Sequence, residues 1–334
     1  MNKIRWGIAG AARVNERLMP AIIDSDLGEL IAIGSRRKGA AKECLLKYAE
    51  QLEDTVQTFD GLDQIVNHDR IDAVYIPMAN EEHVQIALKC IRAKKHVLIE
   101  KPMALKSSEV EMLFDEAKKY NVKIMEGFMY AFHPQFDRIQ NVIKSNILGE
   151  VNYVHSMFSF PIQPARYYRI NRNMKQGGGA LWDIGPYAIH TVRQCFKENP
   201  IKVLASAKLN EHGADISTTG MIDFGNNKRA TFDISFECTR RSEFEVFGPL
   251  GRVKCPTVWQ PEDKSAKVIY ITEGSGINEE IVPQANHFIL EINHFNKLIL
   301  SQIEQKLDKN DAVWNAKTLE AIEKSISNKK WIEI

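Results

Sequence analysis

Three side chains between residues 183 and 190 are of types that could move a proton. Asp183, Tyr187 and His190 are separated by four and three positions, so on a helix they share one face. A carboxylate, a phenol and an imidazole on one face could form a proton relay, or equally a capped and hydrogen-bonded helix start. The run 177–179 just before them is three glycines, which allow close backbone approach or positive φ angles.

A second candidate group is the tripeptide Glu100-Lys101-Pro102, which directly follows the strand-like run 97–99. This position is the carboxyl edge of the expected sheet, where open α/β folds bind their ligands. A lysine there can hydrogen-bond a substrate hydroxyl and, through its charge, lower the pKa of a neighbouring acid. Taken alone, the tripeptide is more typical of a solvated surface lysine.

Two further segments could hold a dinucleotide. The turn Gly10-Ala11-Ala12-Arg13-Val14-Asn15 connects the first expected strand and helix, where backbone N–H groups can approach a pyrophosphate. It has a single glycine, so an ordinary tight turn is the alternative. The second strand ends in Gly34-Ser35-Arg36-Arg37, and a hydroxyl beside two guanidinium groups favours a ribose 2′-phosphate. This pattern predicts NADP(H) and leaves NAD(H) as the alternative cofactor, unless the arginines only solvate a helix start.

The elements that position these residues follow from the hydrophobic pattern. Over residues 1–125, short β-branched runs alternate with amphipathic stretches, which is typical of a parallel sheet covered on both faces. We therefore predict a doubly wound Rossmann domain for this part of the chain. The expected strands are 4–8, 30–33, 73–76, 96–99 and 122–125, and the expected helices are 14–22, 40–49, 81–93 and 108–120.

The pattern changes after about residue 150. Alternating strands separated by turn residues, such as Asn226-Asn227 and Pro249-Leu250-Gly251, predict a large, mainly antiparallel open sheet. Residues 126–334 are thus expected to form an α+β domain for substrate binding and oligomerisation, with C-terminal helices that can pack back on the first domain. The expected strands are 151–158, 203–208, 219–223, 229–236 and 243–247, and the expected helices are 286–305 and 311–327.

Composition argues against several classes of protein. The chain has 44 basic and 43 acidic residues and a formal charge of +1, unlike most proteins that bind nucleic acid or membrane surfaces. No apolar run approaches a membrane span, and the N-terminus lacks a signal-peptide pattern. The five cysteines are scattered, as expected of reduced thiols in a cytoplasmic protein. The histidines lack metal-ligand spacing, so we predict no metal site.

Taken together, these stretches resemble the Gfo/Idh/MocA family of oxidoreductases. The chain departs from the family pattern at Ala12 and Asn15 in the glycine motif, and at Lys94, where the family often has glycine. The Glu-Lys-Pro tripeptide and the triple glycine, in this order, are the most specific matches. The matching segments are 6–13, 71–77, Asn80, His83, 95–98, 100–102, 128–134, 177–187 and 291–295.

The resemblance implies a site and a reaction. Lys101, Asp183 and Tyr187 are the implied catalytic residues, and the Lys101–Pro102 bond is implied to be cis. Tyr187 stands where many members have histidine, which indicates the branch resembling glucose-fructose oxidoreductase and dihydrodiol dehydrogenase. The open sheet implies a homodimer or homotetramer. The implied cofactor-binding residues are Gly10, Ala11, Ala12, Arg13, Val14, Ser35, Arg36, Arg37, Pro77, Asn80, His83, Glu100 and Lys101.

In the implied mechanism a hydride moves between the nicotinamide and a carbinol or carbonyl carbon of a sugar, sugar derivative or related diol. Tyr187, with its pKa lowered by the Lys101 charge, is the general acid or base, and Asp183 holds a substrate hydroxyl. A nucleotide-sugar 3-ketoreductase is one alternative, because Arg166, Tyr167, Tyr168, Arg169 and Arg172 could grip a diphosphate or line a subunit interface. A non-catalytic NADP-binding regulatory protein is the other.

Overall fold

The computed structural model describes residues 3–259, 266–274 and 276–334, which form two compact units. The first unit comprises the chain up to residue 104 together with residues 108–129 and 286–313. The second comprises residues 105–107, 130–285 and 314–334. The chain therefore returns to the first unit after it has completed most of the second.

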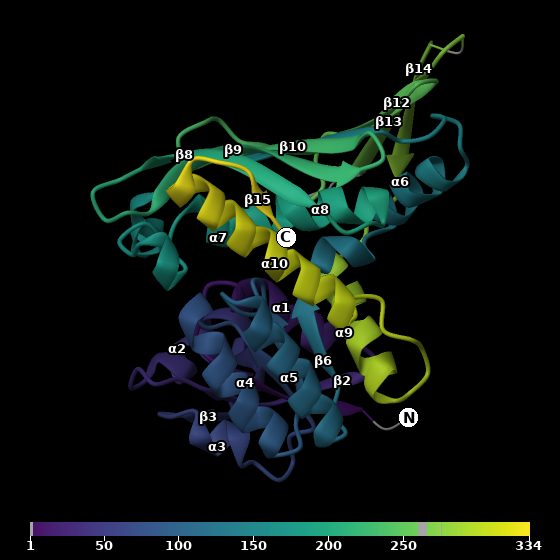
Figure 1. Cartoon of the computed structure of the whole chain (residues 1–334). Helices are drawn as coiled ribbons and strands as arrows, with labels where there is room; N and C mark the ends of the chain where they lie inside the picture. The colour runs from purple at the N-terminus through teal and green to yellow at the C-terminus, as the bar shows by residue number, and fades with distance from the viewer. Residues whose placement is uncertain (1–2, 260–265, 275) are drawn as a thin grey trace. The chain divides into compact units, whose positions relative to one another are not determined.

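The first unit is built on a six-stranded parallel sheet with the order β3-β2-β1-β4-β5-β6 (Figure 1). This is the strand order of a Rossmann dinucleotide fold, so the predicted doubly wound domain is confirmed. All five expected strands are present, and one short strand, β3, was not expected. The strands are β1 (Ile4–Ala9), β2 (Gly28–Gly34), β3 (Gln57–Phe59), β4 (Ala73–Ile76), β5 (His96–Glu100) and β6 (Ile124–Gly127).

Helices cover both faces of this sheet. Successive strand residues point to opposite faces, so neighbouring side chains on one strand contact different helices. Trp6 of β1 contacts Phe295 of helix α9 and donates to Asn296 Oδ1 at 3.0 Å, whereas Gly7 faces Ile65 of α3. The helices are α1 (Asn15–Asp24), α2 (Ala40–Ala49), α3 (Asp63–Val66), α4 (His83–Arg92), α5 (Ser107–Lys119) and α9 (His287–Ile299), with the 3-10 helices η1 (Glu50–Leu52) and η2 (Asn80–Glu82).

The second unit is built on a nine-stranded sheet with the order β14-β13-β12-β11-β7-β10-β9-β8-β15. It is antiparallel apart from the β7–β10 pair, as predicted. Asn226 and Asn227 both have positive φ and form the β9–β10 hairpin turn. The strands are β7 (Tyr153–Ser159), β8 (Lys202–Leu209), β9 (Asp215–Gly225), β10 (Lys228–Ser235), β11 (Arg241–Gly248), β12 (Gly251–Cys255), β13 (Ala266–Thr272), β14 (Gly276–Val282) and β15 (Ile332–Glu333).

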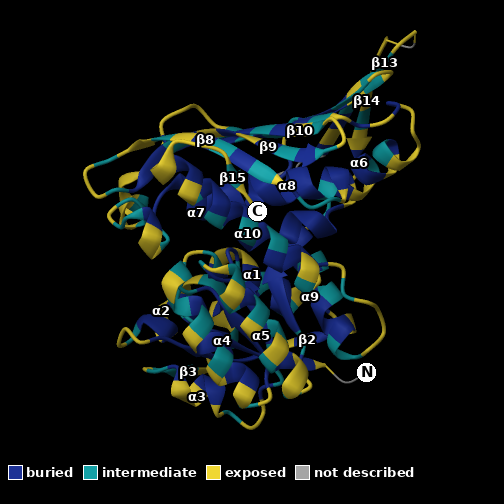
Figure 2. Cartoon of the chain, in the orientation of Figure 1, coloured by how far each residue is buried: buried dark blue, intermediate teal, exposed yellow. Residues whose placement is uncertain are grey.

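One face of the nine-stranded sheet is covered by helices and the other is open. On β7, Val154, Ser156 and Phe158 are buried, whereas Tyr153, His155 and Met157, which alternate with them, are half-buried. In Figure 2 helix α8, which lies against this sheet, is almost entirely buried. The long helix α8 packs against β7, β10 and β11 on the covered face. The remaining elements of the unit are η3 (Met129–Phe132), α6 (Pro134–Lys144), η4 (Pro164–Arg169), η5 (Met174–Gln176), α7 (Ala180–Asp183), α8 (Gly185–Phe196) and α10 (Lys309–Asn328), of which η3 and α10 begin in the first unit.

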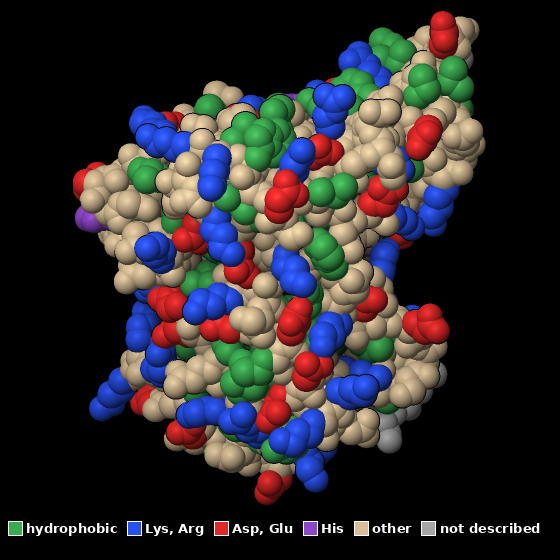
Figure 3. All heavy atoms as spheres, viewed as in Figure 1, with side chains coloured by type: hydrophobic (Ala, Val, Ile, Leu, Met, Phe, Trp, Pro, Cys, Tyr) green, Lys and Arg blue, Asp and Glu red, His purple; other side chains and the backbone are tan. Residues whose placement is uncertain are grey.

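Two properties of the described residues bear on the partners that the protein can have. None of the helices in the described ranges is both long and apolar enough to cross a membrane. Across the same ranges, no group of three or more His, Cys, Asp or Glu side chains is arranged to hold a metal ion. The face of the molecule drawn in Figure 3 carries acidic and basic side chains interspersed, in line with the formal charge of +1.

Candidate active site

The turn after β1 has the geometry that a pyrophosphate needs. Gly10 has φ +138°, a conformation that favours glycine, and its N–H donates to the Gly34 carbonyl at 2.9 Å. Asn15, fully buried, donates from Nδ2 to the Gly10 carbonyl at 2.9 Å and so closes the turn where the glycine motif usually has its third glycine. Among the described contacts, the backbone N–H groups of residues 11–14 donate to no acceptor within the chain. These donors fit a dinucleotide phosphate.

The end of β2 places a hydroxyl and two cations beside this turn. Ser35 is buried, and its Oγ accepts from the Arg37 N–H at 3.2 Å. The Arg37 guanidinium donates to the Ala11 carbonyl at 3.3 Å, which ties the predicted 2′-phosphate site to the pyrophosphate turn. The Arg36 side chain is exposed and ion-paired with Glu82. Residues 34–38 contain no carboxylate, so this segment fits a phosphate better than a bare ribose hydroxyl.

Lys101 directly follows β5 and is 9% exposed. The Lys101–Pro102 bond is cis, which confirms the expectation from the family resemblance. The buried His83 ring lies 2.8 Å from the Pro102 carbonyl and 3.0 Å from the Met78 carbonyl. Burial lowers the pKa of His83 to about 4, so the neutral ring donates to one of these two oxygens. His83 thereby fixes the segment after Lys101 against the loop after β4, and direct cofactor contact stays a prediction.

The carboxylate next to Lys101 has a defined environment. Tyr75 of β4 donates to Glu100 Oε1 at 2.7 Å. Glu291 of α9 is 2% exposed, and burial together with the Glu100 charge raises its pKa well above the usual range. The surroundings of Glu291 therefore favour its uncharged form. Of the other predicted cofactor residues here, Pro77 is buried and Asn80 is half-buried at the start of η2.

In the second unit, Asp183 is held between two arginines. Its side chain is 4% exposed, and its oxygens accept from Arg166 Nη2 at 3.0 Å and from Arg169 Nη1 at 2.5 Å. Both arginines belong to η4, so this 3-10 helix orients the carboxylate. Asp183 is the last residue of α7, and Ile184 interrupts the helix before α8 begins at Gly185. The expected single helix through residues 183, 187 and 190 is therefore wrong for its first member.

The triple glycine proves to be a packing requirement. A Cβ on Gly178 would lie 2.0 Å from the Arg172 carbonyl oxygen, and one on Gly179 would lie 1.9 Å from Asp215 Oδ1. Gly179 also has φ +95°. Asp215, fully buried, accepts from the Leu181 N–H at 2.9 Å and so braces the start of α7. Sequence reasoning missed Asp215, because no local pattern links it to a helix more than thirty residues earlier in the chain.

Tyr187 lies in the first turns of α8 and is 9% exposed. Its ring centroid is 5.7 Å from that of Phe158, 6.3 Å from that of Tyr130 and 6.3 Å from that of Trp259. His190, the alternative proton donor, is fully buried, and its Nδ1 lies 2.5 Å from Tyr130 Oη. Asp183 and Tyr187 thus belong to the second unit and Lys101 to the first. Sequence reasoning gave no role to Tyr130 or Trp259.

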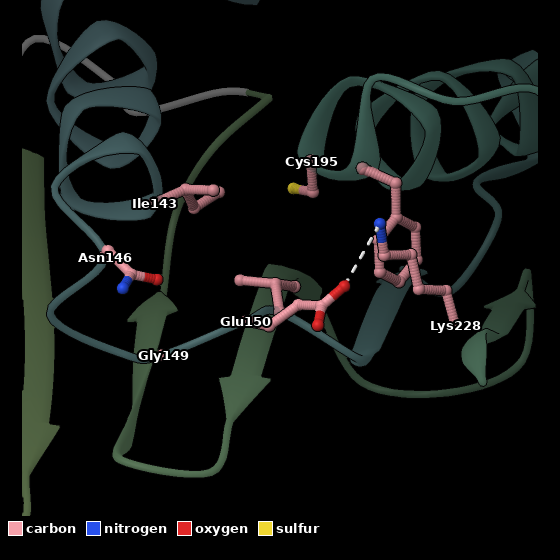
Figure 4. A pocket seen from close by; sticks show the side chains of 8 residues that line it. Ile143, Asn146, Gly149, Glu150, Cys195 and Lys228 are labelled. Carbon is pink, nitrogen blue, oxygen red and sulfur yellow. Dashed lines mark ion pairs between the residues drawn. The ribbon is translucent and has the colours of Figure 1, made fainter. Parts of the chain in front are cut away.

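A small pocket of about 200 Å³ involves none of the predicted site residues (Figure 4). Cys195 and Lys228 line it together with the loop before β7. The Lys228 ammonium lies 2.6 Å from Glu198 and 3.7 Å from Glu150, so its charge is already compensated. We therefore assign no ligand to this pocket.

Two family models match the chain over most of its length. Residues 4–128 match the model described as "Oxidoreductase family, NAD-binding Rossmann fold", and residues 136–254 match the model described as "GFO/IDH/MocA C-terminal domain". The chain belongs to the Gfo/Idh/MocA oxidoreductase family. The resemblance carried by the sequence motifs is confirmed, as is the assignment to the oxidoreductases.

Members of known activity are similar over almost the whole chain. A dTDP-3,4-didehydro-2,6-dideoxy-α-D-glucose 3-reductase from Actinomadura kijaniata is 26% identical, over 96% of this chain and 95% of that protein. A D-xylose 1-dehydrogenase (NADP⁺) from Haloferax volcanii is also 26% identical, covering 98% and 99%. The crystal structure of a 3-ketoreductase from A. kijaniata with NADP and TDP-benzene has a TM-score of 0.89 and 25% identity, covering 97% and 98%.

Proposed function

We propose that this member of the family is an NADP(H)-dependent oxidoreductase that acts on a carbinol or carbonyl carbon of a sugar, a sugar derivative or a related diol. The observation that carries the proposal is Tyr187, a phenol on the covered face of the second sheet, held by three aromatic rings and following a clamped carboxylate. The relatives of known activity include an NADP⁺-dependent xylose dehydrogenase and a nucleotide-sugar reductase.

The first unit would hold the cofactor through its own backbone and cations. The N–H groups of residues 11–14 would bind the pyrophosphate, and Ser35, Arg36 and Arg37 would bind the 2′-phosphate. The remaining predicted contacts, from Pro77, Asn80, His83, Glu100 and Lys101, lie at the carboxyl edge of β4 and β5 or follow it. The bound nicotinamide would supply or accept the hydride.

The side chains of the chain itself would handle the proton and the hydroxyls. Tyr187 would donate its phenolic proton to the carbonyl oxygen in reduction and take it back in oxidation. Lys101 would hydrogen-bond the same oxygen through its ammonium and so favour the phenolate form of the tyrosine. Asp183 already accepts from two guanidinium groups, yet a carboxylate has about four acceptor positions and can orient a substrate hydroxyl as well.

A nucleotide-sugar substrate is the second candidate. It is favoured by two exposed tyrosines, Tyr167 and Tyr168 at 45% and 54% exposure, next to the arginines of η4. Aromatic faces can stack on a base, and arginine suits a diphosphate. Against it, Arg166 and Arg169 already bind Asp183, which reduces the charge that they can offer to a second anion.

A substrate panel tests these alternatives. D-Xylose, D-glucose, a trans-dihydrodiol and a dTDP-linked deoxysugar would be supplied with NADP⁺ or NADPH, and the nicotinamide absorbance band would be followed. Turnover of the free sugars supports the main proposal, and turnover of the dTDP-sugar alone supports the second. No turnover with any of them would favour the non-catalytic NADP-binding alternative.

Tyr187→Phe tests the assignment of the proton. The variant keeps the ring and removes the hydroxyl, so NADPH should still bind while the rate falls about a hundredfold to ten-thousandfold. His190→Ala should cost much less, because His190 is fully buried. If Tyr187→Phe turns over normally and His190→Ala is inactive, histidine carries the proton and the assignment is wrong.

We also propose that the open face of the nine-stranded sheet joins copies of the chain into a homodimer or homotetramer. A groove of about 960 Å³ on this face is lined by Tyr153, Met221, Arg229 and Trp331, among others. Exposed apolar side chains beside charged ones are typical of a subunit interface. Sedimentation of the wild type and of Met221→Glu would test this, and an unchanged mass would oppose it. A cytoplasmic location remains an expectation of the cysteine pattern.

A further inference from the structure

Two of the three rings around Tyr187 are hydrogen-bonded to the helix that carries it. Trp259, in the loop after β12, donates from Nε1 to Thr191 Oγ1 at 2.9 Å. Thr191 donates in turn to Tyr130 Oη at 2.9 Å. Thr191 lies four residues after Tyr187 on α8, so both side chains lie on the same face of the helix. The hydroxyl of Thr191 thereby joins the two rings to the turn of helix just beyond Tyr187.

The chain of hydrogen bonds continues to His190. Tyr130 Oη lies 2.5 Å from His190 Nδ1, and the two rings meet edge to face. Trp259, Thr191, Tyr130 and His190 are each fully buried. Hydrogen bonds between buried groups are costly to break, because a donor left without an acceptor loses its hydration without replacement. The four side chains therefore form one hydrogen-bonded network.

The third ring is joined to this hydrogen-bonded network by stacking. Phe158 of β7 stacks on Trp259 with centroids 4.7 Å apart and an interplanar angle of 24°. It also meets Tyr187 edge to face at 5.7 Å. Rings from η3, β7 and the loop after β12 thus surround the Tyr187 phenol, and two of them, Tyr130 and Trp259, are joined through the hydroxyl of Thr191.

We infer that Thr191 and Tyr130 are positioning residues, which hold the Tyr187 hydroxyl where it can transfer a proton. This inference rests on the proposed role of Tyr187. Neither residue needs to touch the substrate. Proton transfer requires donor and acceptor within hydrogen-bond reach, and a misplacement of about 1 Å can lower a rate about a hundredfold. The rings of Tyr130 and Trp259 are hydrogen-bonded to α8, the helix that carries Tyr187, and therefore restrict such movement.

Thr191→Val is the sharpest test, because valine keeps the shape and removes only the hydroxyl. We expect kcat to fall about tenfold to a hundredfold while KM changes by less than about twofold, since the substrate contacts remain. Thr191→Ser keeps a hydroxyl and should restore kcat to within about threefold of the wild type. Tyr130→Phe, which keeps the ring, should reproduce the Thr191→Val result and serves if that variant does not fold.

A matched control separates positioning from simple loss of stability. Ser325 of α10 is fully buried and makes two hydrogen bonds, accepting from the Ala205 N–H at 2.9 Å and donating to the Lys330 carbonyl at 2.7 Å. Ser325→Ala thus removes two hydrogen bonds of a buried hydroxyl from the second unit, as Thr191→Val does, but on α10 instead of α8. It should lower the unfolding temperature comparably and leave kcat unchanged.

The rates would be measured with NADP⁺ and the panel sugar that the wild type oxidises fastest. The indole N–H resonance of Trp259, assigned with Trp259→Phe, should shift in Thr191→Val and stay in place in Thr191→Ser. Normal kcat in Thr191→Val, an equal loss of kcat in Ser325→Ala, a raised KM alone, or an unmoved indole resonance would each overturn the inference. If Tyr187→Phe is inactive while Thr191→Val is normal, only this inference fails. If Tyr187→Phe is active, the proposed role of Tyr187 is wrong, and the inference that rests on it is rejected as well.

Discussion

Glycine turns precede helix α1 in the first unit and helix α7 in the second, and the space beside the glycine differs between the two turns. In the first unit, the turn at Gly10 precedes α1, and the backbone N–H groups of residues 11–14 donate to no acceptor among the residues that the structure describes. In the second unit, Gly178 and Gly179 are buried, and protein atoms occupy the space that a side chain would need. The first turn is proposed to bind the cofactor, whereas Arg172 and Asp215 fill the space beside the second.

A glycine run near a predicted site does not by itself indicate ligand contact. At Gly10 a Cβ would meet the flexible Met78 side chain at 3.3 Å and the Pro77 ring at 3.5 Å. At Gly179 it would overlap a buried carboxylate that also braces α7. Loss of the glycine should therefore affect cofactor binding in the first case and folding in the second.

Gly179→Ala should show the largest effect on stability. The backbone conformation alone costs about 1–3 kcal/mol for a residue with a side chain. Overlap with Asp215 at 1.9 Å adds to this, so we expect a loss of about 3 kcal/mol or more in the free energy of unfolding, measured with urea. Gly39→Ala is the control, because Gly39 has φ +74° with nothing within 4 Å of the added Cβ. A similar loss in both variants would show that the overlap is relieved.

Asp215→Asn should change how stability depends on pH. Burial raises the pKa of Asp215 from 3.8 to about 6, so the folded protein holds this proton more tightly than the unfolded chain does. The contribution of Asp215 to stability is full below about pH 4 and is lost as the pH rises through about 6, on the order of 3 kcal/mol in all.

The measurement is the difference in unfolding free energy between the wild type and Asp215→Asn at pH 4.5 and 7.5. Taking the difference cancels other titrating groups, such as His96, whose pKa burial lowers to about 4. The wild type should lose stability relative to the variant as the pH rises. A difference that is the same at both values would contradict the account of the second turn.

Gly10→Ala should mainly weaken cofactor binding. The Kd for NADPH, from fluorescence titration, should rise about tenfold or more, because the added methyl lies on the turn whose N–H groups are proposed to bind the phosphates. Stability should fall by about 1–3 kcal/mol from the φ of +138°, less than in Gly179→Ala. An unchanged Kd would remove the distinction between the two turns.

Arg36→Ala should have the smallest effect, and it tests whether the segment beside the first turn prefers NADP(H) to NAD(H). We expect the wild type to bind NADP(H) at least about tenfold more tightly than NAD(H), a gap of roughly 1.4 kcal/mol, and the variant to lose most of it. Arg36 is ion-paired with Glu82, so Glu82→Gln should widen the preference slightly by releasing the guanidinium. Equal affinities of the wild type for both cofactors would reject the NADP(H) prediction.

Much of the first unit could be predicted because its signals are local. Strands such as 73–76 are continuous apolar runs, and helix 40–49 follows the amphipathic period closely enough to match the structure at both ends. The short strand β3 and the four-residue helix α3 were missed, since such short elements carry little periodicity. In the second unit, β12, β13 and β14 were missed because Gly251 to Val282 mixes charged and apolar residues without a clear alternation.

The sequence by itself determined the doubly wound domain, the turn at Gly10, the cations at Arg36 and Arg37, and the candidate side chains Lys101 and Tyr187. Each of these depends on neighbours within a few positions, where backbone geometry fixes which side chains can meet. Only the tertiary structure decided what surrounds them. Asp215 meets Gly179, and Thr191 meets both Tyr130 and Trp259, across separations of 36, 61 and 68 residues. Such contacts arise from packing of whole elements, which no local spacing encodes.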